Sequence, residues 1–308
     1  MSAPTVIMAA PMLVPQAMAR LVDAGLSVHA LPAGASLAEM CAALQPDAIL
    51  AGQNRIDAAV LTASRRLRIV ARHGAGVDNV DLMAAAASGV VVTRAPDANA
   101  RATAEHALSL ILALAKCIGP LSAIVAAGGW RADTPTTRDL VGLRLGLVGF
   151  GPIGRTVATL ASALGMDVAQ HHATGGMPLD VLLARSDVLS LHCPLLPATR
   201  HILDAAALAC LPRGALVVNT SRGGLIDEKA LLAALDCGQV AGAGLDVFER
   251  EPPDADDPLR RHPRVIATPH MAGSTAGAMV AVGLMAAECI VAALTGGTVR
   301  RECVVPTP

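Results

Sequence analysis

Short apolar runs recur along the first hundred residues, and segments of helical length and composition separate them. The runs cover residues 5–9, 27–31, 48–51, 68–72 and 90–93, and the segments between them include 16–24 and 80–88. Short apolar runs that alternate with helices are typical of a parallel sheet with helices on both faces. The pattern therefore predicts an α/β domain in the leading part of the chain.

The same alternation returns from Leu143 onward. A helix is expected to end near Leu164 and another to lie near 179–184, and strands are expected at 143–148, 167–170, 188–192, 215–219, 242–246 and 265–267. A long apolar stretch, 98–127, joins the two halves and is interrupted by Lys116, Gly119 and Pro120. We interpret it as a helix that leads from one α/β domain into a second.

A glycine motif follows the first strand of the second half. Residues 143–155 read LRLGLVGFGPIGR, which places Gly149, Gly151 and Gly154 in the spacing GxGxxG between a strand and a helix. Gly149 permits a tight turn, Gly151 lets the backbone approach a pyrophosphate, and Gly154 allows close helix packing. Although glycines also mark ordinary turns, this context favours a dinucleotide bound at the helix N-terminus.

Composition excludes several classes of partner. The net charge of −1 implies no nucleic-acid or membrane partner, and the 1% aromatic content leaves no platform for stacking bases. The seven cysteines form no CxxC pair, so we interpret them as buried apolar residues of a reducing cytosol and expect no metal site. The apolar segment 276–294 contains Glu288 and is expected to be a buried helix rather than a membrane span. The N-terminus lacks the basic region of a secretory signal, which favours a cytoplasmic protein.

Three polar residues stand just after predicted strands, where open parallel sheets bind ligands. Arg222 follows the strand 215–219, Glu251 follows 242–246, and His270 follows 265–267. An Arg can hold a carboxylate, a Glu can orient a His, and a His can exchange a proton near neutral pH. Each residue also has a structural alternative, namely pairing of Arg222 with Asp227, a solvated Glu251, or a helix cap at His270. Their joint placement favours hydride transfer on a 2-keto or 2-hydroxy acid.

Several longer stretches carry a resemblance to a known family. They are RHGAGVDNVD at 72–81, NARATAEHAL at 99–108, the glycine motif itself, SDVLSLHCPLLPATRHIL at 186–203, VVNTSRGGLIDEKAL at 217–231, GAGLDVFEREP at 242–252 and TPHMAGST at 268–275. With them the chain resembles the D-isomer-specific 2-hydroxyacid dehydrogenases over nearly its whole length.

The resemblance implies two Rossmann-like or flavodoxin-like domains, with the active site in the cleft between them. Residues 1–98 and 277–308 would form the substrate domain, and an NAD(P)-binding domain, 99–276, would be inserted between them. His270 would be the acid/base, Glu251 its orienting partner, and Arg222 the group that binds the substrate carboxylate and polarises its carbonyl. The backbone amides of Gly74, Ala75 and Gly76 would also bind that carboxylate.

The resemblance also implies a set of cofactor-binding residues. Asp246 would contact the nicotinamide carboxamide, Thr220 and Ser221 would line the nicotinamide ring, and the adenosine would lie along His192, Cys193 and Pro194. Cys193 is thus a neighbour of the cofactor and not a nucleophile. The remaining members of the set are Gly149, Gly151, Pro152, Ile153, Gly154, Arg155, His171, His172, Thr199 and Thr103.

The chain departs from the family pattern at the ribose. An NAD-specific Rossmann unit usually ends its second strand on Asp or Glu, but here His172, eighteen residues beyond Gly154, stands at that position. Without a carboxylate, nothing repels a 2′-phosphate, so the cofactor is NAD or NADP and the pattern favours NADP. Against this, no Arg stands beside His172, and NAD could be held by other contacts.

A second departure concerns the substrate. After the strand 48–51, many relatives place an Arg that reaches the substrate, whereas here only Arg55 is near. We therefore expect a small acid such as glyoxylate or hydroxypyruvate, with 3-phosphoglycerate as the alternative. Because the sequence stops at Pro308, we do not expect the C-terminal regulatory domain of some phosphoglycerate dehydrogenases.

Other functions are possible on the same fold. A corepressor-like protein that senses the dinucleotide without catalysis would conserve much of the pattern, and a phosphite or formate dehydrogenase would act on a different anion. The resemblance also implies a homodimer, formed through the cofactor domains and the apolar 98–127 region.

Overall fold

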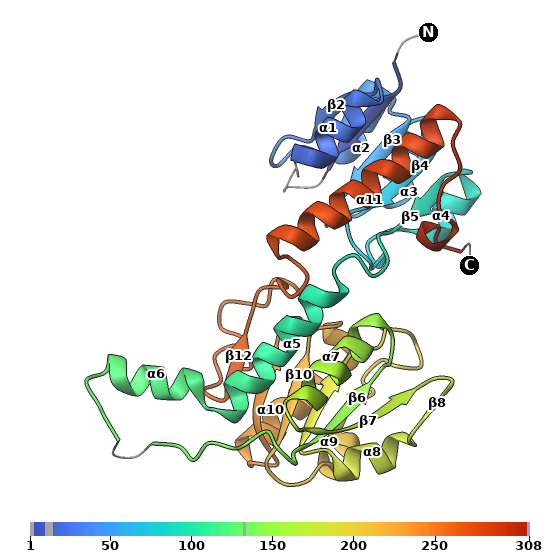
Figure 1. The fold of residues 1–308 in the computed structure, drawn as a ribbon. Coiled ribbons are helices and arrows are strands. Elements are labelled where there is room, and N and C mark those ends of the chain that lie inside the picture. Colours follow the sequence, from blue (N-terminus) through green and yellow to red (C-terminus); the bar gives the residue numbers. More distant parts are fainter. Residues whose placement is uncertain (1–2, 10–14, 132–133, 307–308) are drawn as a thin grey trace. The chain divides into compact units, whose positions relative to one another are not determined.

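The computed structural model describes residues 3–9, 15–131 and 134–306, and the chain divides into two compact units. The first unit comprises Met1–Asn99 with Ser274–Pro308, and the second comprises Ala100–Gly273. Each unit contains one sheet, of five strands in the first and seven in the second (Figure 1). The predicted α/β class with two parallel sheets is confirmed.

The sheet of the first unit has the order β2-β1-β3-β4-β5, and all its strands are parallel. These strands are β1 (Thr5–Met8), β2 (Ser27–Ala30), β3 (Ala48–Ala51), β4 (Ile69–Arg72) and β5 (Val91–Thr93). The backbone N–H of Val305 donates to the carbonyl of Val92 at 2.9 Å, so the end of the chain lines the edge strand. The reversal of strand order beside β1 is that of the flavodoxin-like fold.

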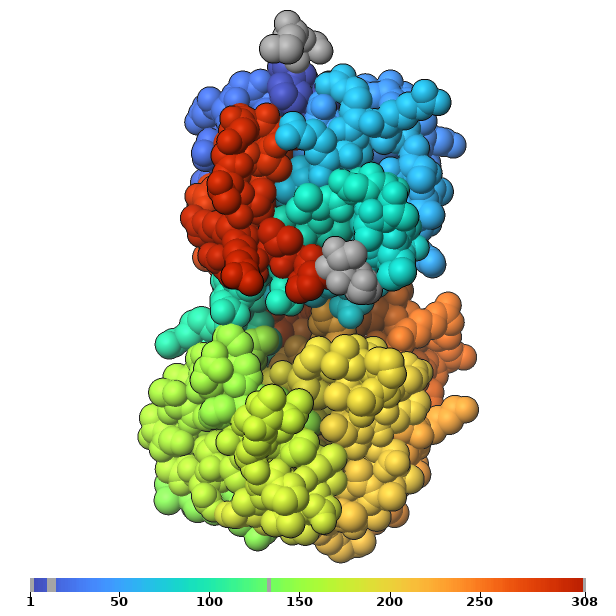
Figure 2. All heavy atoms as spheres, turned by 90° about the vertical axis from the view of Figure 1, so that its right-hand side faces the viewer, coloured from blue at the N-terminus to red at the C-terminus, as the bar shows by residue number. Residues whose placement is uncertain are grey.

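Helices cover both faces of this first sheet. α1 (Pro15–Asp23) and α11 (Ala276–Thr295) pack on the face that carries Val6, Met8 and Leu50, and the other face is covered by α2 (Leu37–Leu44), α3 (Ala58–Ala63) and α4 (Leu82–Ala87). Figure 2 shows the C-terminal residues in red lying against the first third of the chain. A short 3₁₀ helix, η2 (Arg301–Cys303), follows α11. Residues from the two ends of the sequence thus share one core.

Helix α11 is long and apolar enough to cross a membrane by length and composition alone. In this structure 44% of its most apolar window is buried, and residues such as Ala287 and Ile290 lie in the core of the first unit. Its apolar character is therefore used to cover β3 and β4, as expected of a buried helix.

The seven strands of the second sheet have the order β12-β11-β10-β9-β6-β7-β8. They are β6 (Arg144–Val148), β7 (Asp167–His172), β8 (Gly175–Gly176), β9 (Val188–Leu191), β10 (Ala215–Asn219), β11 (Val240–Leu245) and β12 (Val265–Ala267). Only β8, a two-residue edge strand, is antiparallel among the described strands. The order reverses between β6 and β9, which is where a doubly wound sheet binds its dinucleotide.

Helices also cover both faces of the second sheet. α5 (Ala100–Ala115) and α7 (Pro152–Ala163) pack on the face that carries Leu145 and Leu147, and the other face is covered by α8 (Leu179–Arg185), α9 (Ala205–Cys210) and α10 (Glu228–Asp236). A short 3₁₀ helix, η1 (Gly223–Leu225), lies between β10 and α10. Near-continuous burial of β6, β9 and β10 explains why these strands read as apolar runs.

The apolar stretch 98–127, which the sequence shows interrupted at Lys116, Gly119 and Pro120, forms two helices. α5 ends at Ala115, and α6 (Ile118–Ala126) begins after a bend of 59° at a residue, Cys117, with φ of 50°. Pro120 does not break the helix, because it occupies the first turn of α6, where a missing N–H costs nothing. None of the residues of α6 is buried, and it projects from the second unit (Figure 1).

Candidate active site

The three glycines of the motif have different structural roles. A Cβ atom on Gly149 would lie 2.5 Å from the carbonyl carbon of His192, and one on Gly154 would lie 2.4 Å from the carbonyl oxygen of Gly149. A Cβ atom on Gly151 would meet nothing within 4 Å, and this residue is the N-cap of α7. The first two glycines therefore permit close backbone packing, while Gly151 borders open space at a helix N-terminus, which suits a pyrophosphate.

Two buried polar atoms near this loop lack protein partners. His192 donates or accepts one hydrogen bond, between Nε2 and Ser190 Oγ at 2.9 Å, and burial lowers its pKa to about 4. Its Nδ1 atom and the hydroxyl of Thr220 are buried without a hydrogen-bond partner in the part of the chain that the structure describes. Since buried polar groups normally have partners, these atoms and the open space at Gly151 fit a bound dinucleotide.

Hydrogen bonds also order the loops after β9 and β10, at the same edge of the sheet. The residues that they involve include Cys193, Pro194, Thr199 and Ser221. Ser221 Oγ donates to the carbonyl of Cys193 at 2.6 Å, which ties the loop after β10 to the loop after β9. Thr199 Oγ1 donates to the carbonyl of Pro194 at 2.7 Å and accepts the N–H of Leu196 at 2.8 Å. Burial raises the pKa of the Cys193 thiol to about 11, so this cysteine is not suited to act as a nucleophile.

The ends of β6 and β7 carry the candidate ribose residues. His171 and His172 are the last two residues of β7, which is two residues longer than predicted. The ring of His172 stacks on Phe150, with centroids 6.2 Å apart and planes 14° apart, and its Nδ1 lies 3.1 Å from Thr174 Oγ1. Arg155 Nη1 donates to the carbonyl of Phe150 at 3.1 Å. Phe150 was missed by sequence reasoning although it stands inside the glycine motif.

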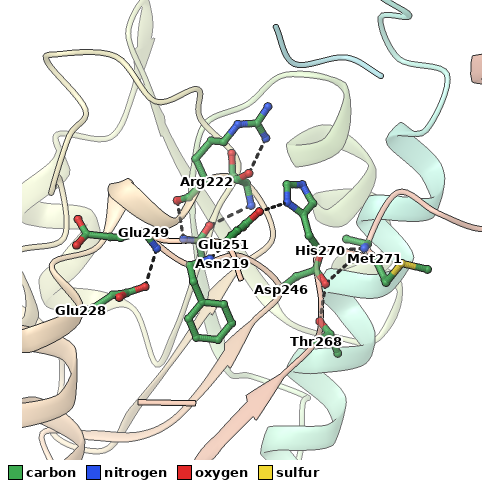
Figure 3. A network of polar contacts seen from close by, with 12 residues as sticks. Asn219, Arg222, Glu228, Asp246, Glu249, Glu251, Thr268, His270 and Met271 are labelled. Atoms are coloured by element: carbon green, nitrogen blue, oxygen red, sulfur yellow. Dashed lines mark hydrogen bonds and ion pairs between the residues drawn. The ribbon is translucent and has the colours of Figure 1, made fainter. Parts of the chain in front are cut away.

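Glu251 and His270 form an ion pair at the C-terminal edge of the second sheet. His270 Nδ1 lies 2.7 Å from Glu251 Oε2, and their side chains are 39% and 33% exposed (Figure 3). Burial raises the pKa of Glu251, but the hydrogen bond and charge of His270, the N–H of Phe248 and the charge of Arg222 outweigh it, so the net pKa is lowered. Glu251 is therefore an ionised partner for the imidazole, and proton exchange with a ligand falls to Nε2 of His270.

Asp246 holds the turn that carries His270. Its fully buried carboxylate accepts the hydroxyl of Thr268 at 2.5 Å and the N–H groups of Met271 and Ala272, both at 2.8 Å. His270 itself has a φ of 55°, in the left-handed region that non-glycine residues rarely adopt. The carboxylate of Asp246, after β11, is thus bonded to the loop after β12; the nicotinamide contact that the family resemblance implies for Asp246 stays a prediction.

His106 of α5 extends the same network. Its Nε2 atom lies 3.0 Å from Thr268 Oγ1 and 3.6 Å from Asp246 Oδ1. Thr268 and His106 both lie in stretches that carry the family resemblance, but their side-chain roles could not be read from the sequence. Thr103, one turn earlier on α5, is also buried. The N-terminal half of α5 therefore supports the loop that follows β12.

Arg222 stands at the N-cap of η1, directly after β10. Its Nη1 donates to the carbonyl of Ser221 at 2.7 Å. The buried Asn219, which sequence reasoning missed, donates through Nδ2 to the carbonyl of Arg222 at 2.9 Å and accepts the N–H of Ser221 at 3.0 Å. Asp227, the alternative partner, instead caps α10 by accepting the N–H groups of its first turn. Asn219 thus sets the path of the backbone at Arg222.

Gly74, Ala75 and Gly76 lie in the first unit, in the loop after β4. Arg72 braces this loop, since its Nη1 donates to the carbonyl of His73 at 2.7 Å and its Nε donates to Asn79 Oδ1 at 3.0 Å. The N–H of Gly74 is already bonded to the carbonyl of Arg72, at 2.9 Å. Among the described residues no acceptor is found for the N–H groups of Ala75 and Gly76, so these two amides are suited to bind an anion.

Comparison with known proteins identifies the family. The model of the D-isomer-specific 2-hydroxyacid dehydrogenase NAD-binding domain matches residues 108–272. The chain belongs to this family. D-3-phosphoglycerate dehydrogenase 3 of Arabidopsis thaliana is 40% identical over 275 residues, which is 85% of this chain and 47% of that relative. This chain thus spans about half the length of the phosphoglycerate dehydrogenase that it matches.

Two further relatives are reductases and are closer to this chain in length. Hydroxypyruvate reductase of Thermotoga maritima is 39% identical over 254 residues, which is 79% of this chain and 82% of that protein. A crystal structure of an NADPH-dependent glyoxylate/hydroxypyruvate reductase from Sinorhizobium meliloti, in complex with NADP and malonate, matches with a TM-score of 0.88 at 28% identity, and covers 99% of this chain and 98% of that one. Members similar to this chain are thus divided between phosphoglycerate dehydrogenases and reductases of smaller keto acids.

Proposed function

We propose that this protein is an NAD(P)-dependent oxidoreductase that interconverts a small 2-keto acid and its D-2-hydroxy acid. The observation that carries the proposal is the His270–Glu251 pair at 2.7 Å. It lies in the same unit, and at the same edge of the sheet, as Arg222 and the glycine loop. A proton donor, a cation and a dinucleotide loop are the groups that reduction of a keto acid needs.

The reaction divides among three side chains. When bound, the nicotinamide supplies the hydride that adds to C2 of the keto acid. His270 donates the proton from Nε2 to the carbonyl oxygen, while Glu251 holds Nδ1 and stabilises the imidazolium before the transfer. Arg222 binds the carboxylate and stabilises the negative charge that develops on the oxygen. In the first unit, the open amides of Ala75 and Gly76 supply hydrogen bonds to a carboxylate.

The cofactor preference is proposed to be NADP. The end of β7 presents His172, stacked on Phe150, where a carboxylate would repel a 2′-phosphate. Arg155, tied to the carbonyl of the same Phe150, adds a positive charge to this region. The test is His172→Asp, with the dissociation constants of 2′,5′-ADP and 5′-AMP measured by calorimetry. If His172→Asp loses affinity for 2′,5′-ADP but not for 5′-AMP, the preference for NADP is supported. Equal affinities of the wild type for the two ligands contradict it.

A small unphosphorylated substrate is proposed over 3-phosphoglycerate. The segment after β3 reads GQNR, and its Arg55 is exposed and paired at 3.9 Å with Asp57. The competing candidate is favoured by a specific finding, the 40% identity to a phosphoglycerate dehydrogenase. Initial rates of NADPH and NADH oxidation with glyoxylate, hydroxypyruvate, pyruvate and phosphohydroxypyruvate decide between them.

The outcomes of that panel separate the remaining functions. Highest kcat/KM on glyoxylate or hydroxypyruvate supports the proposal, and highest kcat/KM on phosphohydroxypyruvate supports the alternative. Tight binding of NADPH without turnover on any acid would indicate a protein that senses the dinucleotide. A separate assay with formate or phosphite follows reduction of NAD+ and NADP+, and activity in that assay alone would indicate a different dehydrogenase.

A homodimer through α6 completes the proposal. Ile118 and Val125 of α6 are 55% and 56% exposed, and Trp130 beyond it is 73% exposed. Exposed apolar side chains on a projecting helix are typical of a subunit interface. Sedimentation of Ile118→Asp with Val125→Asp is expected to give a monomer where the wild type gives a dimer. Val22→Asp, at a residue of α1 that is 53% exposed, is the matched control.

A further inference from the structure

Two turns that carry proposed catalytic groups touch through their backbones. The turn after β10 carries Arg222 and continues into η1, and the turn after β11 carries Glu251. A Cβ atom on Gly223 would lie 1.9 Å from the carbonyl carbon of Phe248 and 2.3 Å from the nitrogen of Glu249. The peptide between Phe248 and Glu249 therefore packs directly on η1, and only glycine fits there.

Glu228 binds this peptide from the side of α10. It stands in the first turn of that helix, behind the N-cap Asp227, and its Oε1 accepts the N–H of Glu249 at 2.8 Å (Figure 3). The preceding N–H, on Phe248, donates to Glu251 Oε1 at 3.1 Å. Two consecutive N–H groups of one turn are thus held by two carboxylates, of which one belongs to the ion pair and the other to α10.

The side chain of Glu249 is directed to other partners. It contacts His201 Nε2, and Arg200 Nη2 lies 3.5 Å from its Oε1. The hydrogen bond to Glu228 uses only the backbone of Glu249, so any residue at 249 except proline could make it. The specific element is therefore the carboxylate of Glu228.

The charge of Glu228 is coupled to the ion pair. Burial raises the pKa of Glu228; the N–H of Glu249 opposes this effect, and the negative charges of Glu249, Asp257 and Glu251 raise the pKa further. Because a charge–charge interaction acts on both partners, an ionised Glu228 also adds negative potential at Glu251, which is hydrogen-bonded to His270. Arg222 adds the opposite charge from the other turn, since it lowers the pKa of Glu251.

We propose that Glu228 is a positioning residue that binds the Glu251 turn to the Arg222 turn, so that the base-orienting carboxylate and the substrate-binding guanidinium keep one relative placement. Glu228 touches neither substrate nor cofactor in this proposal. The inference rests on the proposed function, because it assigns Glu228 to the reaction of His270, Glu251 and Arg222.

Two variants of Glu228 separate its hydrogen bond from its charge. Glu228→Ala removes the acceptor, and loosening of the Glu251 turn is expected to lower kcat about tenfold with KM for the acid within about twofold. Glu228→Gln keeps an acceptor oxygen and is expected to restore kcat to within about threefold of wild type. The matched control is Glu39→Ala, because Glu39 also stands in the first turn of a capped helix, α2, but is exposed and lies in the first unit.

The pH dependence of the reduction rate tests the effect of the negative charge of Glu228. Reduction needs a protonated His270, so its rate falls as pH rises through the imidazole titration. Loss of a negative charge near the pair favours the neutral imidazole, and Glu228→Gln is expected to move this limb to lower pH by on the order of a few tenths of a unit. A merely structural role for Glu228 would change rates without moving the limb.

A readout without turnover distinguishes failure of the inference from failure of the proposed function. In protein labelled with ¹³C at histidine Cε1, the titration midpoint of the His270 resonance, assigned from His270→Asn, is expected to fall in the order wild type, Glu228→Gln, Glu228→Ala. Coincident midpoints in all three proteins would overturn the inference, as would equal loss of kcat in the two variants. If the wild type turns over no acid but the midpoints follow this order, the proposed function fails while the positioning role stands.

Discussion

The loop after β4 in the first unit and the loops after β10, β11 and β12 in the second unit follow strands in the same way but offer different groups. The first is rich in glycine, is braced by Arg72, and presents the open amides of Ala75 and Gly76. The second set presents the side chains of Arg222, Glu251 and His270. The same β–α architecture can therefore end in a neutral backbone site or in a titratable side-chain site, according to the residues at the strand ends.

The largest effect should come from the proton donor of the second unit. His270→Asn is expected to lower kcat for keto-acid reduction about 10³-fold, because asparagine cannot donate a proton to the carbonyl oxygen. Stopped-flow and steady-state rates measure it, with NADPH affinity unchanged. His29→Asn, on β2 of the first unit, is the control and should retain wild-type rates. If His270→Asn kept its rate, the contrast between the two sets of loops would be wrong.

Arg222→Gln is expected to lower kcat/KM about 10²-fold, because the acid loses a charged, two-pronged partner and the developing charge loses its stabilisation. Arg222→Lys keeps the charge but not the fork, so it should recover only part of the loss. Comparison of the two variants across pyruvate and glyoxylate gives the measurement. Full recovery by lysine would mean that the charge alone matters.

Both units also place a half-buried histidine directly after a strand, His73 after β4 and His192 after β9, and desolvation lowers the pKa of each. A lowered folded-state pKa means that the stability is present above the unfolded-state value of 6.5 and is lost as pH falls towards about 4 for His192. Between pH 7.5 and pH 5 the second unit should lose about 2 kcal/mol from this group.

Hydrogen exchange in β9 and β10 measures that loss for the protein without cofactor. His192→Asn should remove most of the acid destabilisation there and leave the exchange of β4 in the first unit as in wild type. An unchanged pH dependence in the variant would show that other groups control the acid sensitivity of the second unit.

The smallest effect should arise in the backbone site. Gly76→Pro removes one N–H from the loop after β4 and is expected to raise KM for the keto acid about tenfold with kcat nearly unchanged. Gly76→Ala keeps the N–H and should stay within about twofold of wild type. Equal KM values for the proline and alanine variants would mean that this amide binds no carboxylate.

Regular elements with continuous apolar runs were predicted well. The strands 48–51 and 215–219 have the predicted bounds, because strands of a parallel sheet are buried on both faces and read as apolar runs. The edge strand 265–267, which is half-buried or exposed, also has the predicted bounds. The strand 167–170 was predicted two residues too short because His171 and His172 are polar. These two residues belong to β7 because His171 pairs with β6 and both pair with β8. The interruption of the 98–127 stretch was predicted at Lys116, Gly119 and Pro120, but the break lies at Cys117, since Pro120 is compatible with a first helical turn.

The candidate site was only partly visible in the sequence. The positions of Arg222, Glu251 and His270 after successive strands were visible, because parallel strands bring their carboxyl ends to one edge. The supporting contacts of Asp246 and Glu228 were not, because each joins a side chain to backbone groups of another turn.

The sequence by itself determined the α/β class, the glycine loop at the head of α7 and the family, because apolar periodicity and short motifs are local properties of the chain. Only the tertiary structure decided that the Asp246 carboxylate holds the His270 turn and that Glu228 reaches the peptide before Glu249. These contacts depend on where separate strands end in space, and no local pattern of residues encodes the direction of a side chain towards a distant turn.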